Sequence, residues 1–244
     1  HHALMRLLLG GQVALVVVLL VGAALMTSTI ARLRAVPLGF AVDRLLTFYV
    51  ALPETRYARE DDVRRFFETL LDRVRALPGV RTASAVNALY VHWGHAIVMP
   101  VPIRGRAAPD RAQPPDTHIR IVDPDLPAVL GIPVRRGRPL SRRDRADAPP
   151  VVVINETMAR RDFAGVDPIG QHLTLSPTSA GEPVWSEIVG VVGDVHQSGL
   201  DSEVQPEIQV SYQQTSIPQL AILVRAAGDA AALLPALRAE VQRL

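Results

Sequence analysis

The sequence contains no cysteine and no lysine among its 244 residues. The absence of cysteine excludes a disulfide framework, a thiolate metal site and a cysteine nucleophile. All 26 basic residues are arginine, which we interpret as a compositional bias of the parent genome, because exposed sites tolerate either basic residue. Without lysine the phosphate-binding loop G-x-x-x-x-G-K-[ST] cannot occur, so the chain does not hydrolyse ATP by that route.

Other signatures of chemistry are also missing. The sequence has no G-x-S-x-G nucleophile elbow, no H-E-x-x-H metal motif and no G-x-G-x-x-G after a predicted strand. Aromatic residues make up only 5%, whereas hydrophobic residues make up 48% and charged residues 20%. This composition excludes a largely disordered chain and fits an ordered globular or membrane-associated protein of one or two domains.

A long apolar run occupies the N-terminal region from Leu7 to Met26, and no charged residue lies between Arg6 and Arg32. A helix of about 20 residues spans about 30 Å, the thickness of the hydrocarbon core of a bilayer. We therefore predict a transmembrane helix over 7–26, within a segment that extends to residue 36. A cleaved signal peptide and a buried core helix are the alternatives. The first needs a small-x-small cleavage site and the second a polar stripe, and neither is evident.

The region after the apolar run has the pattern of a strand, a helix and a second strand. Leu45–Leu52 is rich in β-branched, aromatic and apolar residues, which predicts a strand. Apolar residues then recur at spacings of three and four, which predicts an amphipathic helix with Asp61 or Asp62 as its N-cap. Val80–Leu89 is the second predicted strand, so this region forms a β-α-β unit.

Prolines are frequent between residues 94 and 150, where they interrupt short apolar runs and predict a β-rich insertion of short strands and turns. Downstream, Asn155 is predicted to cap a short helix, and Pro235 fits the first turn of a C-terminal helix. The strand at 208–212 alternates apolar and polar residues, which predicts that one face is buried. Further strands are predicted at 151–154, 172–175, 188–192 and 221–224.

The two ends of this region predict one ferredoxin-like α+β sheet. The strand, helix and strand at 45–89 combine with the strands and helix at 208–244, and the residues between them are inserted. A sheet of this kind has one more strand, which we expect to follow Leu244.

One group of residues has the composition of a metal site. Histidine is the commonest metal ligand, and an H-x-x-H pair is followed by a further acid and histidine. No glutamate accompanies the pair, so a solvated loop is the preferred interpretation. The residues are His92, His95, Asp116 and His118.

Asp194 and His196 are candidates for an acid–base pair, because alternate residues of an extended strand share one face. Glycines flank them and no nucleophile is evident. A turn at the end of a strand is therefore the preferred interpretation.

Arginines cluster between residues 135 and 145, next to Asp144 and Asp147. Such a cluster could contact anionic lipid headgroups or the acidic face of a partner, and a solvated loop is the alternative. No aromatic residues are interleaved for base stacking, which argues against nucleic acid. The candidate contact residues are Arg135, Arg136, Arg138, Arg142 and Arg143.

Several stretches along nearly the whole chain resemble the MacB/FtsX-type ABC transporter permeases, and in particular their MacB-like periplasmic core domain. The stretches are QVALVVVLLVGAAL (12–25), LTFYVALP (46–53), LPGVRTASAV (77–86), LGIPVRRGRPLSRRD (130–144), APPVVVINETMARRDF (148–163), DPIGQHL (167–173), IVGVVGDV (188–195) and PEIQVSY (206–212).

This resemblance implies an α+β fold in which an N-terminal transmembrane helix precedes a core domain over 40–244. Within the core domain it implies a ferredoxin-like porter subdomain at about 45–90 and 206–244, and an inserted β-rich, sabre-like subdomain at about 94–205.

The resemblance also implies a function. The chain would be the extracytoplasmic and membrane part of an inner-membrane permease, and it would be coupled to the ATP-driven motion of a separate nucleotide-binding subunit. Residues from about 40 onward would lie in the periplasm or outside the cell, although Arg32 and Arg34 after the helix favour the opposite orientation by local charge. The implied partners are a cytoplasmic ABC ATPase subunit, a permease dimer or second permease half, a periplasmic adaptor and membrane lipid, without nucleic acid. No cofactor, metal or catalytic residue is implied. The alternatives are a membrane-anchored binding or scaffold module and an enzyme.

Overall fold

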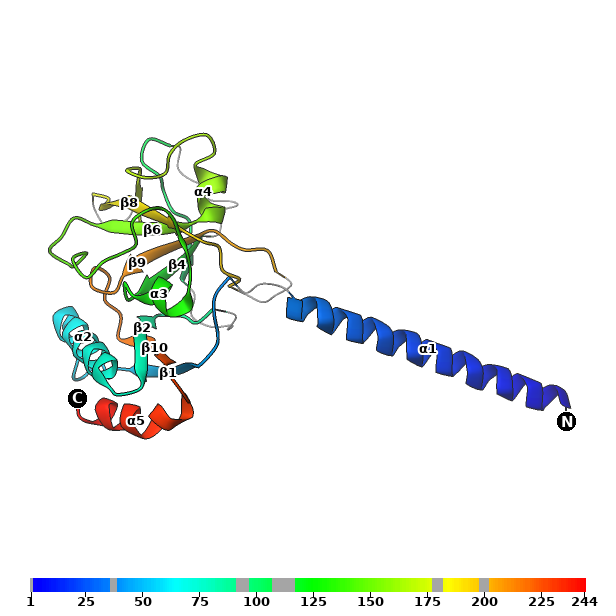
Figure 1. Ribbon diagram of the computed structural model, residues 1–244. Coiled ribbons are helices and arrows are strands. Elements are labelled where there is room, and N and C mark those ends of the chain that lie inside the picture. Colours follow the sequence, from blue (N-terminus) through cyan, green and yellow to red (C-terminus); the bar gives the residue numbers. More distant parts are fainter. Residues whose placement is uncertain (1, 36–38, 91–96, 107–116, 177–181, 198–201) are drawn as a thin grey trace. The chain divides into compact units, whose positions relative to one another are not determined.

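The structure, a computed structural model, describes residues 2–35, 39–90, 97–106, 117–176, 182–197 and 202–244 (Figure 1). The chain divides into two units, His1–Leu38 and Gly39–Leu244.

Most of the first unit is helix α1, which runs from His2 to Ala35 and is longer than the predicted apolar span. Within it, Gly10–Thr29 is long and apolar enough to cross a membrane, and no other helix in the described ranges passes the same test. The hydroxyl groups of Thr27, Ser28 and Thr29 donate hydrogen bonds to helix carbonyls three or four residues earlier. Because these hydroxyls are satisfied within the helix, they do not interrupt it.

The second unit is built on one large mixed sheet. Three of its strands come from the two ends of the unit, and we call them the terminal strands: β1 (Leu45–Ala51), β10 (Gln219–Ala226) and β2 (Val80–Val86), antiparallel in the order β1-β10-β2. The sheet continues through the central strands in the order β4-β9-β6-β8-β5, with β3 beside β4 and β7 beside β8. Their bounds are β3 Ile97–Met99, β4 Thr117–Val122, β5 Val134–Gly137, β6 Val151–Asn155, β7 His172–Thr174, β8 Trp185–Val192 and β9 Glu207–Ser211.

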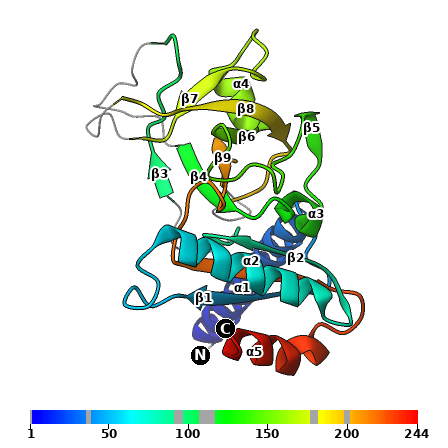
Figure 2. The same cartoon turned by 90° about the vertical axis from the view of Figure 1, so that its left-hand side faces the viewer.

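Helices cover both faces of the terminal strands (Figure 2). On one face lie α2 (Glu60–Ala76) and α5 (Leu234–Gln242), the latter preceded by a short 3₁₀ turn, η1 (Ala231–Leu233). On the other face lies α3 (Leu126–Leu130). Successive residues of a strand point to opposite faces, so β10 is buried on both sides. Its Leu220, Ile222 and Val224 belong to the cluster with α2 and α5, whereas Ala221 and Leu223 belong to the cluster with α3.

The terminal strands and their two helices have the order expected for three strands of a ferredoxin-like sheet, so the α+β fold class is confirmed. The outer edge of β1 has no strand partner among the described residues. This edge is where the fourth strand of such a sheet lies.

Helix α2 confirms the predicted amphipathic pattern, but its predicted start was wrong. Neither Asp61 nor Asp62 is the N-cap; that position is Arg59, which makes no side-chain capping bond. The two aspartates lie in the first turn instead, where a negative charge interacts favourably with the helix dipole. The residues that α2 buries are Val63, Phe67, Leu70, Leu71 and Val74.

Three other sequence predictions have clear outcomes. Asn155 caps α4 (Glu156–Asp162) as predicted, because its side-chain oxygen accepts a hydrogen bond of 2.9 Å from the Met158 amide. The strand at 208–212 was predicted to have one exposed face, but β9 is buried on both faces since it lies inside the sheet. Helix α3 was missed, because proline was taken as a sign of turns, whereas Pro127 lies in the first turn of this helix, where proline is tolerated.

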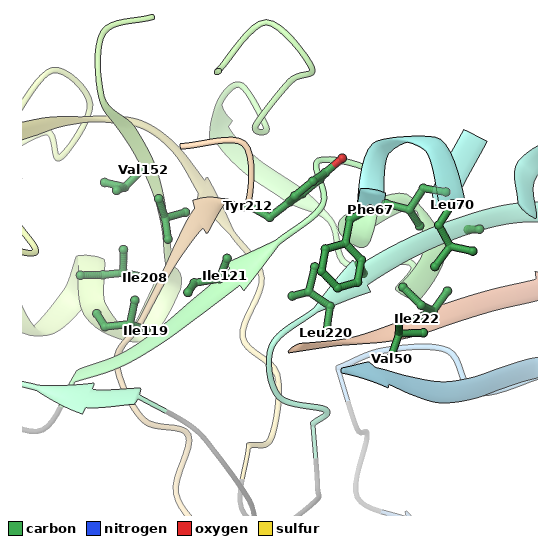
Figure 3. Close-up of a cluster of buried hydrophobic side chains, with 14 of the residues drawn as sticks. Val50, Phe67, Leu70, Ile119, Ile121, Val152, Ile208, Tyr212, Leu220 and Ile222 are labelled. Carbon is green, nitrogen blue, oxygen red and sulfur yellow. The ribbon is translucent and has the colours of Figure 1, made fainter. Parts of the chain in front are cut away.

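One hydrophobic cluster extends beneath both sets of strands (Figure 3). Val50, Leu220 and Ile222 of the terminal strands meet Phe67 and Leu70 of α2. Tyr212, just after β9, lies between this group and the side chains of the central strands, which are Ile119, Ile121, Val152 and Ile208.

Candidate functional site at the junction after the apolar helix

The residues predicted as possible metal ligands are only partly visible. His92, His95 and Asp116 lie outside the described residues, and His118 lies in β4. Within the described ranges, no group of three or more histidine, aspartate and glutamate side chains could hold a metal ion.

Asp194 and His196 engage different partners. The Asp194 carboxylate accepts hydrogen bonds of 2.8 Å from the amide and the hydroxyl of Thr157, and pairs with Arg160 at 2.8 Å. The Nδ1 atom of His196 lies 3.2 Å from the carbonyl oxygen of Ser202. Asp194 therefore holds the first turn of α4 and does not contact His196 as a catalytic acid–base pair would.

The arginine cluster is largely neutralised by the chain's own acids. Ion pairs join Arg135 to Glu156, Arg136 to Asp167, Arg138 to Asp144, and Arg142 to Asp72 and Asp125. Arg143 is the one candidate that makes no ion pair with a described residue. Contact of these five arginines with lipid or a partner stays a prediction, and most of their charge is already balanced locally.

Asp144 is the partner of Arg138 within this cluster, and its carboxyl has a shifted pKa. Its burial by itself would raise the pKa of the carboxyl, but hydrogen bonds from Arg138 and Ser141 outweigh burial and lower that pKa below its usual value. A carboxyl whose pKa is lowered by folding adds stability above the unfolded pKa of about 3.9, and this stability is lost as the pH falls through the folded value.

We expect Asp144→Asn to lower the free energy of unfolding by about 1–3 kcal/mol at pH 7, because charged hydrogen bonds are lost. As the pH falls through the lowered pKa of the folded protein, the difference from wild type is expected to shrink, since the wild-type carboxyl becomes protonated and neutral. Urea unfolding at several pH values measures this, with the exposed neighbour Asp147→Asn as the control. A difference that stays constant with pH would contradict the ion pair.

The segment Gly39–Arg44, which we call the junction, follows α1 in sequence and begins the second unit. In the sequence, Pro37 and Gly39 mark the start of this region. Gly39 has a φ of +80°, and a Cβ there would lie 2.3 Å from the carbonyl oxygen of Asp194. Glycine is therefore required for this close approach to the turn after β8.

Arg225 of β10 fastens the junction to the domain. Its guanidinium donates hydrogen bonds to the carbonyl oxygens of Ala41 at 2.8 Å and Asp43 at 2.5 Å, and to that of Val129 in α3 at 2.6 and 2.8 Å. The Ala41 amide also donates to the Leu130 carbonyl at 2.7 Å. One arginine thus joins the junction, a terminal strand and α3.

Phe40 connects the junction to a buried polar cluster in the central strands. Its ring lies 5.7 Å from that of Tyr90, and the guanidinium of Arg120 lies 3.8 Å from the centre of the Tyr90 ring. Glu207 accepts hydrogen bonds of 2.7 Å from both Arg120 and the Tyr90 hydroxyl, and Gln209 donates to Glu207 at 3.1 Å.

The side chains in this cluster are almost fully buried, with only 2% of Arg120 and 3% of Glu207 exposed. Burial, together with the charge of Glu207, raises the pKa of Tyr90 well above its usual value, so the phenol stays neutral and donates its proton to the hydrogen bond. The groups of this cluster satisfy one another's charges and hydrogen bonds, so their role is structural.

The junction is held at several points of the second unit. It contacts β10, α3, the segment at Asp194 after β8 and, through Phe40, the buried polar cluster. These contacts join it to groups of both the terminal and the central strands. Sequence reasoning missed these residues because the partners lie far apart in the chain.

The fold and this junction define a class of protein in which an apolar helix is followed by an α+β domain, and the buried polar groups of that domain have a structural role. The family model of the MacB-like periplasmic core domain matches residues 9–244, and the chain belongs to this family. The resemblance predicted from the sequence stretches is thereby confirmed.

The fold is shared with a solved structure. The periplasmic region of MacB from Actinobacillus actinomycetemcomitans superimposes with a TM-score of 0.52 at 14% identity, over 82% of each chain. The extracellular domain of the noncanonic ABC-type transporter YknZ from Gram-positive bacteria is also similar, with a TM-score of 0.46 and 16% identity, over 79% of this chain and 88% of that one.

A similar sequence occurs in the pyoverdine export ATP-binding/permease protein PvdT of Pseudomonas aeruginosa. Over 93 residues the two are 29% identical. The match covers 38% of this chain but only 13% of that protein, so the two share a part and not a whole.

Proposed function

We propose that this chain is the membrane and extracytoplasmic part of an ABC transporter permease. ATP hydrolysis on a separate cytoplasmic subunit drives a motion that α1 passes to the domain, where it performs export or mechanical work. Membership of the MacB-like periplasmic core domain family supports this proposal, and so does the likeness to an export ATP-binding/permease protein. In this proposal α1 spans the inner membrane and residues from about 40 onward lie in the periplasm.

The observation that carries the proposal is the way the junction is fastened. A flexible tether would need no specific contacts, yet Gly39 fits tightly against Asp194, and Arg225 holds two junction carbonyls and one of α3. Coupling between distant sites requires an element that both sites bias. In this proposal the junction is such an element, because it follows α1 in the chain and is held by specific contacts within the domain.

The domain is proposed to have no catalysis of its own. Its further proposed partners are a second permease half or a permease dimer, a periplasmic adaptor and lipid around α1. A membrane-anchored binding or scaffold module is the competing function, and it differs in one respect: its domain does not respond to ATP.

The experiment replaces Arg225 by methionine in the transporter assembled with its ATPase subunit in nanodiscs. Spin labels at Thr29→Cys and Arg65→Cys, in this cysteine-free chain, report the distance between α1 and α2. In the otherwise unchanged chain, ATP is expected to shift this distance. In Arg225→Met the shift is expected to be lost while ATP hydrolysis continues.

The matched control is Arg44→Met, which removes an arginine of the junction itself and with it a side-chain hydrogen bond of 2.8 Å to the Ala227 carbonyl. It is expected to keep the ATP-dependent shift. A full shift in Arg225→Met would show that the junction does not transmit motion. No shift in any variant would support the scaffold function.

A further inference from the structure

The terminal and central strands meet at a narrow join in the sheet. Among the described residues, β2 pairs with β4 through one residue pair, Val86 and Val122. Next to it, the Asn87 amide donates to the Ile121 carbonyl at 2.9 Å, and the Asn87 side-chain oxygen accepts from the Ile121 amide at 3.0 Å. By contrast, β1 pairs with β10 along its whole length. The Asp123 amide also donates to the Ala85 carbonyl at 2.8 Å, so a few backbone hydrogen bonds form the join, and it is narrower than the pairing of β1 with β10.

A second connection spans the two sets of strands away from this join. Residues 141–147, which we call the strap, follow β5 and form a turn fixed by Asp144. That carboxylate accepts hydrogen bonds from the Ser141 amide at 2.7 Å and from Arg138 at 2.8 and 2.9 Å. The strap is thus a preformed turn that presents its remaining arginines outward.

Two of these arginines lie against acids of α2 and of the start of α3. Arg142 pairs with Asp72 at 3.2 Å and with Asp125 at 3.4 Å, and Arg145 pairs with Glu68 at 3.2 Å. The side chains of these pairs are between 38% and 57% exposed. Exposed ion pairs are weak and are screened by salt, so these contacts can open and close readily.

We propose that the strap is an electrostatic latch that sets the angle between the terminal and the central strands. When the pairs of Arg142 and Arg145 form, the strap ties α2 to the segment that follows β5. When they are broken, the sheet bends at the Val86–Val122 join. The shared hydrophobic cluster at Tyr212 and Phe67 stays buried and limits the motion to a change of angle.

This inference does not depend on transport, so the full 244-residue chain in nanodiscs is sufficient to test it. Spin labels are placed at Arg65→Cys in α2 and Asp147→Cys in the strap, which lie across the same charged groove. Double electron–electron resonance then measures their distance distribution at low salt and at about 1 M NaCl, where charges are screened within about 3 Å.

A second, longer distance is expected in the distribution, and its population is expected to increase with the salt concentration. Each exposed pair that is broken is expected to raise the ratio of the long to the short distance by about 1.5- to 5-fold. At low salt, Glu68→Arg is expected to produce the same change, and the swapped double variant Glu68→Arg/Arg145→Glu is expected to reverse it.

The matched control is Arg143→Glu. It changes the charge of the strap by the same amount as Arg145→Glu, but at a residue that has no ion pair among the described side chains. It is expected to leave the distance distribution unchanged. The latch is refuted if salt and Glu68→Arg leave a single distance in a folded chain. It is equally refuted if Arg143→Glu shifts the distance as much as Glu68→Arg does.

Discussion

Replacing Glu207 by alanine is expected to lower the free energy of unfolding by about 3–5 kcal/mol, because it leaves a buried charge without its partner. Arg120 is held by Glu207 at 2.7 Å, and only 2% of its side chain is exposed. Water cannot replace the lost carboxylate without opening the central strands. Tyr90 loses its acceptor in the same variant, which adds an unsatisfied hydroxyl.

Urea unfolding of the single and double variants checks this expectation. The double variant Arg120→Met/Glu207→Leu removes both charges, and it is expected to recover most of the loss because an apolar pair of similar size can fill the site. Arg65→Ala is the control for an exposed ion pair of α2, because Arg65 is 75% exposed and pairs with Asp62 at 3.8 Å; the expected cost is below about 1 kcal/mol. A loss of under about 1 kcal/mol for Glu207→Ala would mean that the cluster is hydrated.

Gly39→Ala is the second variant expected to have a large effect, on the junction itself. An added Cβ would meet the Asp194 carbonyl oxygen at 2.3 Å and the Val195 Cα at 3.0 Å, both of them backbone atoms that cannot rotate away. The left-handed conformation of residue 39 costs an alanine about 1–2 kcal/mol, and overpacking adds about 1–3 kcal/mol. Detaching the junction relieves both costs, so we expect the segment to leave its site.

Hydrogen exchange at the Ala41 amide measures this detachment, since that amide is bonded to Leu130 in the intact junction. Faster exchange is expected in Gly39→Ala, together with loss of the ATP-dependent distance change between α1 and α2. Gly165→Ala is a matched control, because its φ of +78° is nearly the same and no atom lies within 4 Å of the added Cβ. If both variants exchange alike, the close approach at Gly39 does not hold the junction.

The two variants separate two kinds of failure. Glu207→Ala weakens the whole domain, and any loss of coupling in it is accompanied by a lower free energy of unfolding. Gly39→Ala is expected to remove Phe40 from the Tyr90 ring but to keep the ion pair of Arg120 and Glu207, so it tests the junction rather than the stability of the domain. If Gly39→Ala loses the ATP-dependent distance change but keeps the free energy of unfolding of the wild type, the junction itself transmits the motion.

Much of the local structure could be predicted from the sequence, because local structure depends on neighbours in the chain. The spacing of apolar residues predicted α2, the β-branched and aromatic run predicted β1, and Asn155 predicted the start of α4. The long apolar run without charged residues predicted α1. The predicted N-cap at Asp61 or Asp62 was wrong. Several acids in a row offer alternative starts, and the first turn of the helix begins slightly earlier.

The candidate site depended on the tertiary structure. Arg120 and Glu207 are 87 positions apart, and Arg225 is 184 positions from Ala41. No pattern of period two or 3.6 reports such pairs, because these periods describe only which face of an element a residue occupies. The arginine cluster illustrates the same limit: its charges are evident in the sequence, but the acids that neutralise Arg142 and Arg145 lie on α2, far away in the chain.

By itself, the sequence determined an apolar helix followed by an α+β domain without a phosphate loop, since composition and periodicity are properties of short stretches. The tertiary structure alone decided that the junction is fastened to both sets of strands and that the strap pairs with α2. These contacts exist only because the sheet brings distant segments together, where burial strengthens the ion pair of Arg120 and Glu207 and solvent weakens those of the strap.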